Sequence, residues 1–267
     1  MDRDWATQWI LPLFDWSKGS TQALQAWHGY LSGGTWNDGL LAHLLPFYEQ
    51  AFTVFSEEFG TFREPFCKYL ACIACFSSIN PIEQGWLSRF IAHARPEERL
   101  WWGSAVWQFL EQMKDPAKEN AWNNWIKPYW QNRITGIPAI LDGREVTLMI
   151  DWSARLKPVF AEIAEEILKS PAPSPRELSA NFVFEDLSNS DLPERNAEPI
   201  ATLLLHMLHN GLCTYYDFDP VEAITQRAAA AGASRKKITD ICDALADLGD
   251  PGAKLLRKTI EDGTGRT

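Results

Sequence analysis

The sequence predicts an all-α protein whose helix pairs stack into an irregular helical-repeat array resembling an α-solenoid. Turn-forming dipeptides recur at short intervals along the chain, for example Asn80-Pro81 and Asp219-Pro220. Apolar residues between these turns recur with the 3.6-residue period of a helix. Sustained alternation of apolar and polar residues, the pattern of a half-buried strand, is nearly absent, and residues 181–184 form the one short candidate.

Capping residues mark two helix starts. Asn80 and Asp219 each precede a proline suited to the first helical turn, and Glu83 and Glu222 follow where a carboxylate can reach back to the cap. We therefore expect a helix to begin at each of these prolines. Four further segments carry an apolar stripe on one helical face, and the stripes begin at Trp102, Val159, Ile200 and Ile238.

Two other prolines lie inside segments of helical length. Pro46 interrupts residues 38–59, and Pro128 interrupts residues 121–133. Proline lacks the backbone N–H and clashes with the preceding turn. We therefore expect a kink, or two abutting helices, at each position.

The proline-rich segment 170–175 is the best candidate for a linker, and composition changes near it. All 13 tryptophans lie at or before Trp152. We predict a Trp-rich helical array over residues 1–170, a linker or irregular segment over 171–195, and a C-terminal helical array over 196–267. Packing of both arrays as one continuous unit stays open.

Charge and hydropathy narrow the class of partner and the compartment. The chain of 267 residues has a formal net charge of −10, from 35 acidic and 25 basic residues, and such a field repels phosphate backbones. Nucleic acid is therefore a disfavoured partner, although a nucleic-acid-binding helical protein is kept as a second alternative. The acidic start does not suit a signal peptide, and charged residues break every apolar run of membrane-spanning length. Five cysteines suit a reducing compartment, so we expect a cytoplasmic protein without a membrane partner.

Common catalytic signatures are missing from the sequence. It contains no glycine-rich phosphate loop, no dinucleotide-binding glycine pattern, no nucleophile elbow and no H-E-x-x-H motif. We therefore predict no catalytic residue, no cofactor and no enzymatic activity for this chain. Cys72 and Cys75 have redox or zinc spacing, but their apolar neighbours favour core thiols.

The best metal candidate is weak and consists of His206, His209 and Cys213. Residues three and four apart project from one side of a helix, and Asp217 or Asp219 is near enough in sequence to be a fourth ligand. This arrangement would suit a metal-dependent hydrolase using His206 and His209, the first alternative function. The turn signal directly after His209 argues against it, because a helix end there would rotate the cysteine away.

The most informative segment is an aromatic helix over residues 121–133. One face carries the apolar side chains and ends in Arg133, while asparagine, glutamine and lysine occupy the other face. An exposed last turn would make a binding site for an acidic or aromatic ligand, with the candidates Trp125, Tyr129, Trp130 and Arg133. The alternative is a core helix in which Arg133 pairs with Glu145 or Asp151, and aromatic stripes favour that interpretation.

Several of these residues also support a resemblance to a known family. The runs involved are A-W-N-N-W at 121–125, Y-W-Q-N-R at 129–133 and G-I-P at 136–138, with Glu145, Met149 and Trp152, and earlier A-W-H-G-Y-L at 26–31 and L-L-P-F at 44–47. The chain resembles the bacterial domain of unknown function numbered 4020, a helical region at the C-terminal end of large proteins with a sirtuin-like N-terminal part.

The resemblance implies a non-catalytic interaction or sensing module in antiphage defence. It implies that this chain is the C-terminal piece of a longer protein and that any NAD hydrolysis belongs to a separate sirtuin-like domain. The expected partner is a protein, either a phage component or the chain's own effector domain, or a second copy of the chain in a homo-oligomer. No sirtuin motif is present here, so no catalytic residue is carried over.

Overall fold

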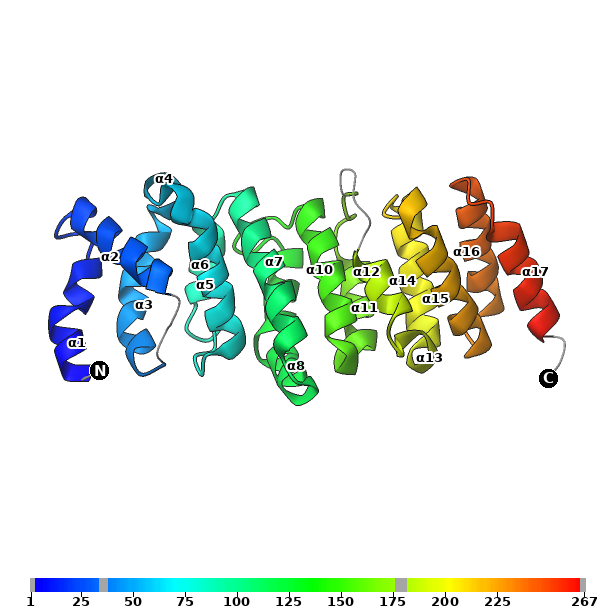
Figure 1. The fold of residues 1–267 in the computed structure, drawn as a ribbon, viewed down its shortest axis with the longest axis horizontal. Helices are drawn as coiled ribbons and strands as arrows, with labels where there is room; N and C mark the ends of the chain where they lie inside the picture. The colour runs from blue at the N-terminus through cyan, green and yellow to red at the C-terminus, as the bar shows by residue number, and fades with distance from the viewer. Residues whose placement is uncertain (1–2, 34–37, 176–181, 265–267) are drawn as a thin grey trace. The chain divides into compact units, whose positions relative to one another are not determined.

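The computed structural model describes residues 3–33, 38–175 and 182–264, and it confirms the all-α class (Figure 1). Helices and turns make up these ranges, and no strand occurs in them. The predicted strand at 181–184 is wrong where it is described, because α12 (Phe182–Ser188) is a helix that buries Val183, Phe184 and Leu187. Asn181 lies outside the described residues. None of the described helices combines the length and apolarity that crossing a bilayer requires. A regular repeat stays a prediction.

The chain divides into two compact units. The first consists of Met1–Gln112 and Asn123–Ile140, and the second consists of Met113–Trp122 and Leu141–Thr267. The first unit contains α1 (Arg3–Trp9), η1 (Leu11–Phe14), α2 (Ser20–Gly33), α3 (Asp38–Phe52), α4 (Phe55–Glu58), η2 (Gly60–Phe62), α5 (Arg63–Phe76), α6 (Trp86–His93), α7 (Pro96–Gln112) and α9 (Lys127–Ile134). The second contains α8 (Asp115–Ala121), α10 (Gly143–Arg155), η4 (Lys157–Val159), α11 (Phe160–Lys169), α12, α13 (Leu192–Arg195), α14 (Ala197–His209), η5 (Tyr215–Asp217), α15 (Phe218–Ala230), α16 (Arg235–Asp247) and α17 (Ala253–Thr264).

Aromatic rings form the core of the first unit. Trp27 is completely buried, and its ring centroid lies 4.8 Å from that of Tyr48, 5.0 Å from that of Phe14 and 5.5 Å from that of Phe66. All three pairs are edge-to-face, the arrangement that aromatic quadrupoles favour. Trp27 of α2 thus connects η1, α3 and α5 in one aromatic cluster.

Helices of the second unit pack on neighbours that are close along the chain. α10 packs on α11 and α12, α11 packs on α14, and α14 packs on α15 and α16. α16 and α15 in turn contact α17 (Figure 1). Helices before and after the proline-rich segment therefore share one unit, while packing of both predicted arrays as one continuous unit stays a prediction.

The proline-rich segment is hydrogen-bonded to the start of α10 and is therefore not a linker without contacts. Ser174 N donates to the Gly143 carbonyl (2.9 Å), and Thr147 Oγ1 donates to the Ser174 carbonyl (2.6 Å). A Cβ atom at position 143 would lie 2.3 Å from Ser174 Oγ, so glycine permits this close approach. Residues 182–188 and 192–195 are helical, which corrects the irregular segment predicted over 171–195.

The predicted helix starts are displaced in both cases. Asn80 Oδ1 accepts hydrogen bonds from the N–H groups of Ile82 (2.9 Å) and Glu83 (3.2 Å), but these bonds close a turn, and α6 begins only at Trp86. Gly85, at φ 70°, redirects the chain between turn and helix. Near Asp219, α15 already begins at Phe218, after a capping box made by Thr214 and the last residue of η5.

The two internal prolines have different consequences. α3 runs through Pro46 and ends at Phe52, so the expected break is displaced toward α4. Pro128 follows a π-helical turn, η3 (Trp122–Ile126), and lies in the first turn of α9. A proline at this position removes the helical donor of the Asn124 carbonyl. Asn80 Nδ2 supplies a replacement donor at 3.1 Å.

Candidate functional site

The four predicted binding residues lie in the interior. Trp125, Tyr129, Trp130 and Arg133 are each at most 5% exposed. The Trp102 ring of α7 lies 6.1 Å from that of Trp125 and 5.2 Å from that of Tyr129. The expectation of an exposed last turn is therefore wrong, because the helical period keeps the whole aromatic face directed into the core. None of the four side chains presents a docking surface.

Arg133 secures the chain that follows α9. Its Nε donates to the Ala139 carbonyl (3.1 Å) and its Nη2 to the Ile140 carbonyl (3.2 Å). Nη1 donates to the Tyr129 hydroxyl oxygen at 2.8 Å. A completely buried guanidinium with these contacts is a structural group that fixes the path of residues 135–140. The predicted pairing of Arg133 with Glu145 or Asp151 stays a prediction.

The metal candidates do not form a ligand set. α14 ends at His209, so Cys213 lies beyond the helix, where it is buried, whereas His209 is exposed. Asp217 uses its carboxylate to accept from the N–H and the hydroxyl of Thr214, at 2.8 and 2.7 Å. Burial lowers the pKa of His206, and the neighbouring His209 adds to the decrease. In the described part of the chain, no group of three His, Cys, Asp or Glu side chains is arranged to hold a metal ion.

The two cysteines with C-x-x-C spacing lie on α5. Cys72 and Cys75 are unoxidised and partly buried, while their neighbours Leu70, Ala71 and Ile73 are in the core. Burial raises the pKa of the Cys75 thiol, with Cys72 as a smaller cause. A thiol held in its neutral form is a poor nucleophile and a poor metal ligand. Cys75 therefore contributes to packing.

The first unit contains a buried carboxylate that was not predicted from the sequence. Glu98 is completely buried on α7 and accepts hydrogen bonds from Ser56 Oγ (2.6 Å) and from the Arg95 N–H (2.7 Å). Arg63 Nη1 donates to it at 3.2 Å, and the same guanidinium lies 5.4 Å from the centroid of the Trp101 ring. The R-P-E-E run was the available signal, because a carboxylate at the third helical position can bond the capping N–H. These donors satisfy the carboxylate, which suits a structural role.

A pair of carboxyl groups connects α15 to the turn between α16 and α17. Asp250 is buried, and its Oδ1 accepts from the Gly252 N–H at 2.8 Å. Glu222 Oε1 lies so near this turn that a Cβ at Gly252 would be 2.0 Å from it. Burial, a hydrogen bond with Asp250 and the charges of Asp250 and Asp219 raise the pKa of Glu222 to about 7. This group therefore titrates near neutral pH.

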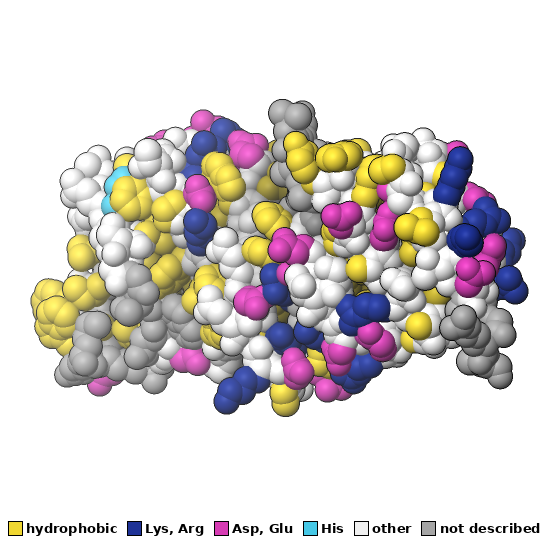
Figure 2. Space-filling model, turned by 45° about the vertical axis from the view of Figure 1, so that its right-hand side comes forward, with side chains coloured by type: hydrophobic (Ala, Val, Ile, Leu, Met, Phe, Trp, Pro, Cys, Tyr) yellow, Lys and Arg dark blue, Asp and Glu magenta, His cyan; other side chains and the backbone are white. Residues whose placement is uncertain are grey.

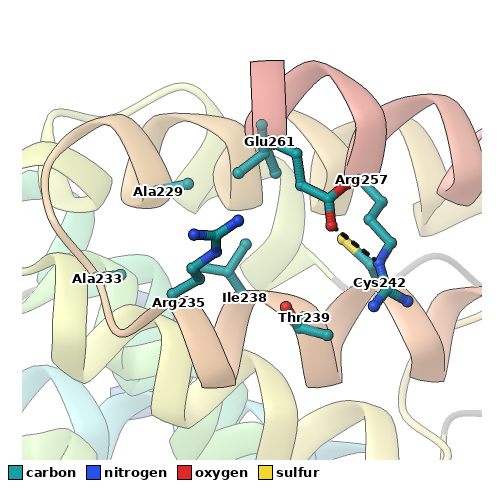
Figure 3. A pocket seen from close by; sticks show the side chains of 9 residues that line it. Ala229, Ala233, Arg235, Ile238, Thr239, Cys242, Arg257 and Glu261 are labelled. Carbon is teal, nitrogen blue, oxygen red and sulfur yellow. Dashed lines mark hydrogen bonds and ion pairs between the residues drawn. The ribbon is translucent and has the colours of Figure 1, made fainter. Parts of the chain in front are cut away.

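A small cavity of about 60 Å³ lies among α15, α16 and α17 (Figure 3). Alanine, isoleucine and cysteine side chains supply apolar walls, and two arginines, a threonine and a glutamate supply polar groups. The lining residues are Ala229, Ala233, Arg235, Ile238, Thr239, Cys242, Arg257, Ile260 and Glu261. Its size suits a small ligand or part of a larger one.

Exposed aromatic side chains gather on α1. Trp5 is 50% exposed and Trp9 is 57% exposed, and Leu13 in η1 is 37% exposed. Ala6, between the two tryptophans in the sequence, is buried, and α1 packs on α3 and η1. Figure 2 shows an apolar patch at its left-hand end, where Figure 1 places α1. The four-residue spacing of the two tryptophans was visible in the sequence but does not by itself distinguish an exposed face from a buried one.

Comparison with known proteins gives one family match. The family model described as a domain of unknown function (DUF4020) matches residues 73–248. No curated protein and no solved structure matches the chain. The matched region covers α6 to α16 and therefore includes the Arg133 helix and most of the second unit.

Proposed function

The chain belongs to the DUF4020 family, and we propose that it acts as a non-catalytic helical interaction module that contacts a protein partner through α1. One observation carries this proposal: two tryptophans one helical turn apart are half-exposed on a helix that packs on α3 and η1. Exposing such large apolar side chains to water is unfavourable. Tryptophan is also among the residues most enriched in interface hot spots.

The chemistry of the interior agrees with a binding role. Among the described residues, the most conspicuous polar groups, Arg133 and Glu98, are buried and hydrogen-bonded within the protein. The metal candidates His206, His209 and Cys213 are not brought together in a ligand set. The ligand set that a hydrolase using His206 and His209 would need is therefore not formed among the described residues.

A finer proposal concerns the biological setting. We propose that the module works in the bacterial cytoplasm as part of a sirtuin-like, NAD-consuming antiphage protein, and senses a phage component or holds the effector domain. The resemblance of the aromatic segment to sirtuin-associated proteins is the ground for this setting. Catalysis then belongs to the effector, and the purified chain should not hydrolyse NAD.

The test is capture of partners on the immobilised chain, with variants that change only the exposed face of α1. Extracts of phage-infected and uninfected bacteria would be passed over the wild type, a Trp5→Ala/Trp9→Ala double variant and a Gln8→Ala control, with bound proteins quantified by mass spectrometry. We expect a partner that the control retains and the double variant loses by about tenfold or more, since one hot-spot tryptophan contributes about 2 kcal/mol.

Two results would contradict the proposal. Equal retention by the double variant and the wild type would exclude α1 as the contact surface. NAD turnover by the purified chain that a substitution within it abolishes would exclude a non-catalytic role. Both tryptophans are exposed, so circular dichroism and the thermal midpoint should be unchanged in the double variant, which separates a binding defect from unfolding.

A further inference from the structure

We propose that the cavity among α15, α16 and α17 is a binding site for a short aliphatic carboxylate. This inference is independent of the proposed partner surface on α1, because it depends only on residues 229–261 of the second unit. The cavity combines an apolar interior with an arginine at its mouth, a combination that recognises the two ends of such a ligand separately.

Helical spacing builds the two long walls. On α16, Arg235, Ile238, Thr239 and Cys242 follow one another at intervals of three, one and three residues, and therefore lie on one face. On α17 the corresponding face carries Arg257, Ile260 and Glu261.

Small residues leave the space between these walls. Ala229 on α15 and Ala233 in the turn that follows contribute only a methyl group each. Larger side chains at these two positions would fill the opening. Ile238 and Cys242 are buried beneath it and form an apolar floor.

The charges at the cavity favour an anion. Figure 3 shows the Arg235 side chain rising from the first turn of α16 toward Ala229 and Glu261. Within the described residues, Arg235 makes no hydrogen bond or ion pair from its side chain. Arg235 is exposed in the first turn of α16, at the positive end of the helix dipole, where Glu198 Oε2 accepts a hydrogen bond from the Ser234 N–H at 2.7 Å.

The neighbouring acidic groups already have a cation. Arg257 Nη1 lies 2.6 Å from Asp243 Oδ1, and Arg257 Nε lies 3.4 Å from Glu261 Oε1. Asp243 and Glu261 therefore share Arg257, and the guanidinium of Arg235, which makes no ion pair among the described residues, is the cation at the cavity that can interact with a ligand. A bound carboxylate could form a bidentate pair with it, and the Thr239 hydroxyl also lines the cavity.

Size and polarity select the rest of the ligand. A cavity of about 60 Å³ accommodates a short branched alkyl group but not a long chain or a ring system. An inorganic anion would leave the isoleucine and cysteine walls uncovered, and a neutral alcohol would not use the arginine. The shared chemistry is therefore a carboxylate on a short aliphatic group, either as a free acid or as the C-terminal leucine of a peptide.

Titration of the whole chain with 3-methylbutanoate tests the proposal, followed by NMR shifts of backbone amides. We expect saturable shifts confined to α15, α16 and α17, with a dissociation constant on the order of millimolar for so small a ligand. Arg235→Gln should weaken binding by about tenfold or more, because a charged hydrogen bond is lost. Ala233→Leu should abolish binding by filling the cavity.

The control variant is Lys236→Gln, which removes a charge from the same turn but does not line the cavity. It should bind like the wild type. N-acetyl-leucine, compared with 3-methylbutanoate, distinguishes a peptide terminus from a small free acid, and the amide of N-acetyl-leucine should not bind because it lacks the carboxylate. The proposal is overturned if 3-methylbutanol or inorganic phosphate binds as well as the acid, or if Arg235→Gln, with an unchanged thermal midpoint, binds normally.

Discussion

Replacing Glu222 by glutamine should remove a decrease in stability that the wild type shows as the pH rises through neutrality. In the folded protein, burial and the neighbouring Asp250 raise the pKa of Glu222 from 4.5 to about 7. Between these two values the folded state holds a proton that the unfolded chain has released. The stabilisation is therefore fully present below pH 4.5 and is lost as the pH rises through about 7.

The size of the effect follows from the two pKa values. A change from 4.5 to about 7 corresponds to about 3 kcal/mol if the group is fully shielded. Glu222 is partly exposed, and solvent screening reduces the electrostatic part. We therefore expect the free energy of unfolding of the wild type to fall by about 1–2 kcal/mol between about pH 5 and about pH 8 because of this residue.

Urea unfolding, followed by far-UV circular dichroism at several pH values, measures this difference. Glu222→Gln should be more stable than the wild type at the upper end of the range and should lose most of the pH dependence, because its amide does not ionise. Asp247→Asn is the control, since it removes an exposed carboxylate at the end of α16, away from the Asp250 pair. Parallel pH profiles for the wild type and Glu222→Gln would refute the reasoning.

Two further substitutions test the buried polar groups. Arg133→Ala should lower the free energy of unfolding by about 3 kcal/mol, because it removes a buried guanidinium that donates to two carbonyls. Asn132→Ala, on the exposed side of the same helix, should change the free energy of unfolding little. An unchanged thermal midpoint for Arg133→Ala would show that the residue is not structural. Glu98→Ala should also lower the free energy of unfolding, measured in urea, by about 3 kcal/mol, because Arg63 loses its buried acceptor. Glu97→Ala removes a more exposed partner of Arg63 and should lower it by less than about 1 kcal/mol. Equal losses in the last two variants would contradict a special role for the buried carboxylate.

Gly252→Ala provides an independent check on the carboxyl pair. A Cβ at this position would displace the Glu222 carboxyl, since the two atoms would be only 2.0 Å apart. Its end is flexible, so the side chain should turn toward solvent and its pKa should return toward the ordinary value. We expect the pH dependence of the free energy of unfolding to be weaker than in the wild type, as in Glu222→Gln. A wild-type pH profile in this variant would show that contact with the turn does not perturb Glu222.

The sequence by itself determined the helical class and which residues share a helical face. The aromatic face of residues 121–133 was predicted from spacing alone, and its side chains are in the core. Helical periodicity depends only on local geometry, in which residues three and four apart share a face, so it identifies the residues that lie on one face together. The same geometry placed the end of α14 near His209 and so indicated that Cys213 would leave the two histidines.

Tertiary structure alone decided which distant groups meet. Asn80 was assigned as a helix cap, yet its side-chain amide also satisfies the Asn124 carbonyl that Pro128 leaves without a donor. Likewise, Glu222 looked like part of a helix start, and its contact with the Asp250 turn depends on how α15 packs on α17. Such contacts depend on helix packing and on the path of the connecting loops, and neither is encoded in local spacing. For the same reason the sequence could not distinguish the exposed tryptophans of α1 from the buried ones of the Arg133 helix.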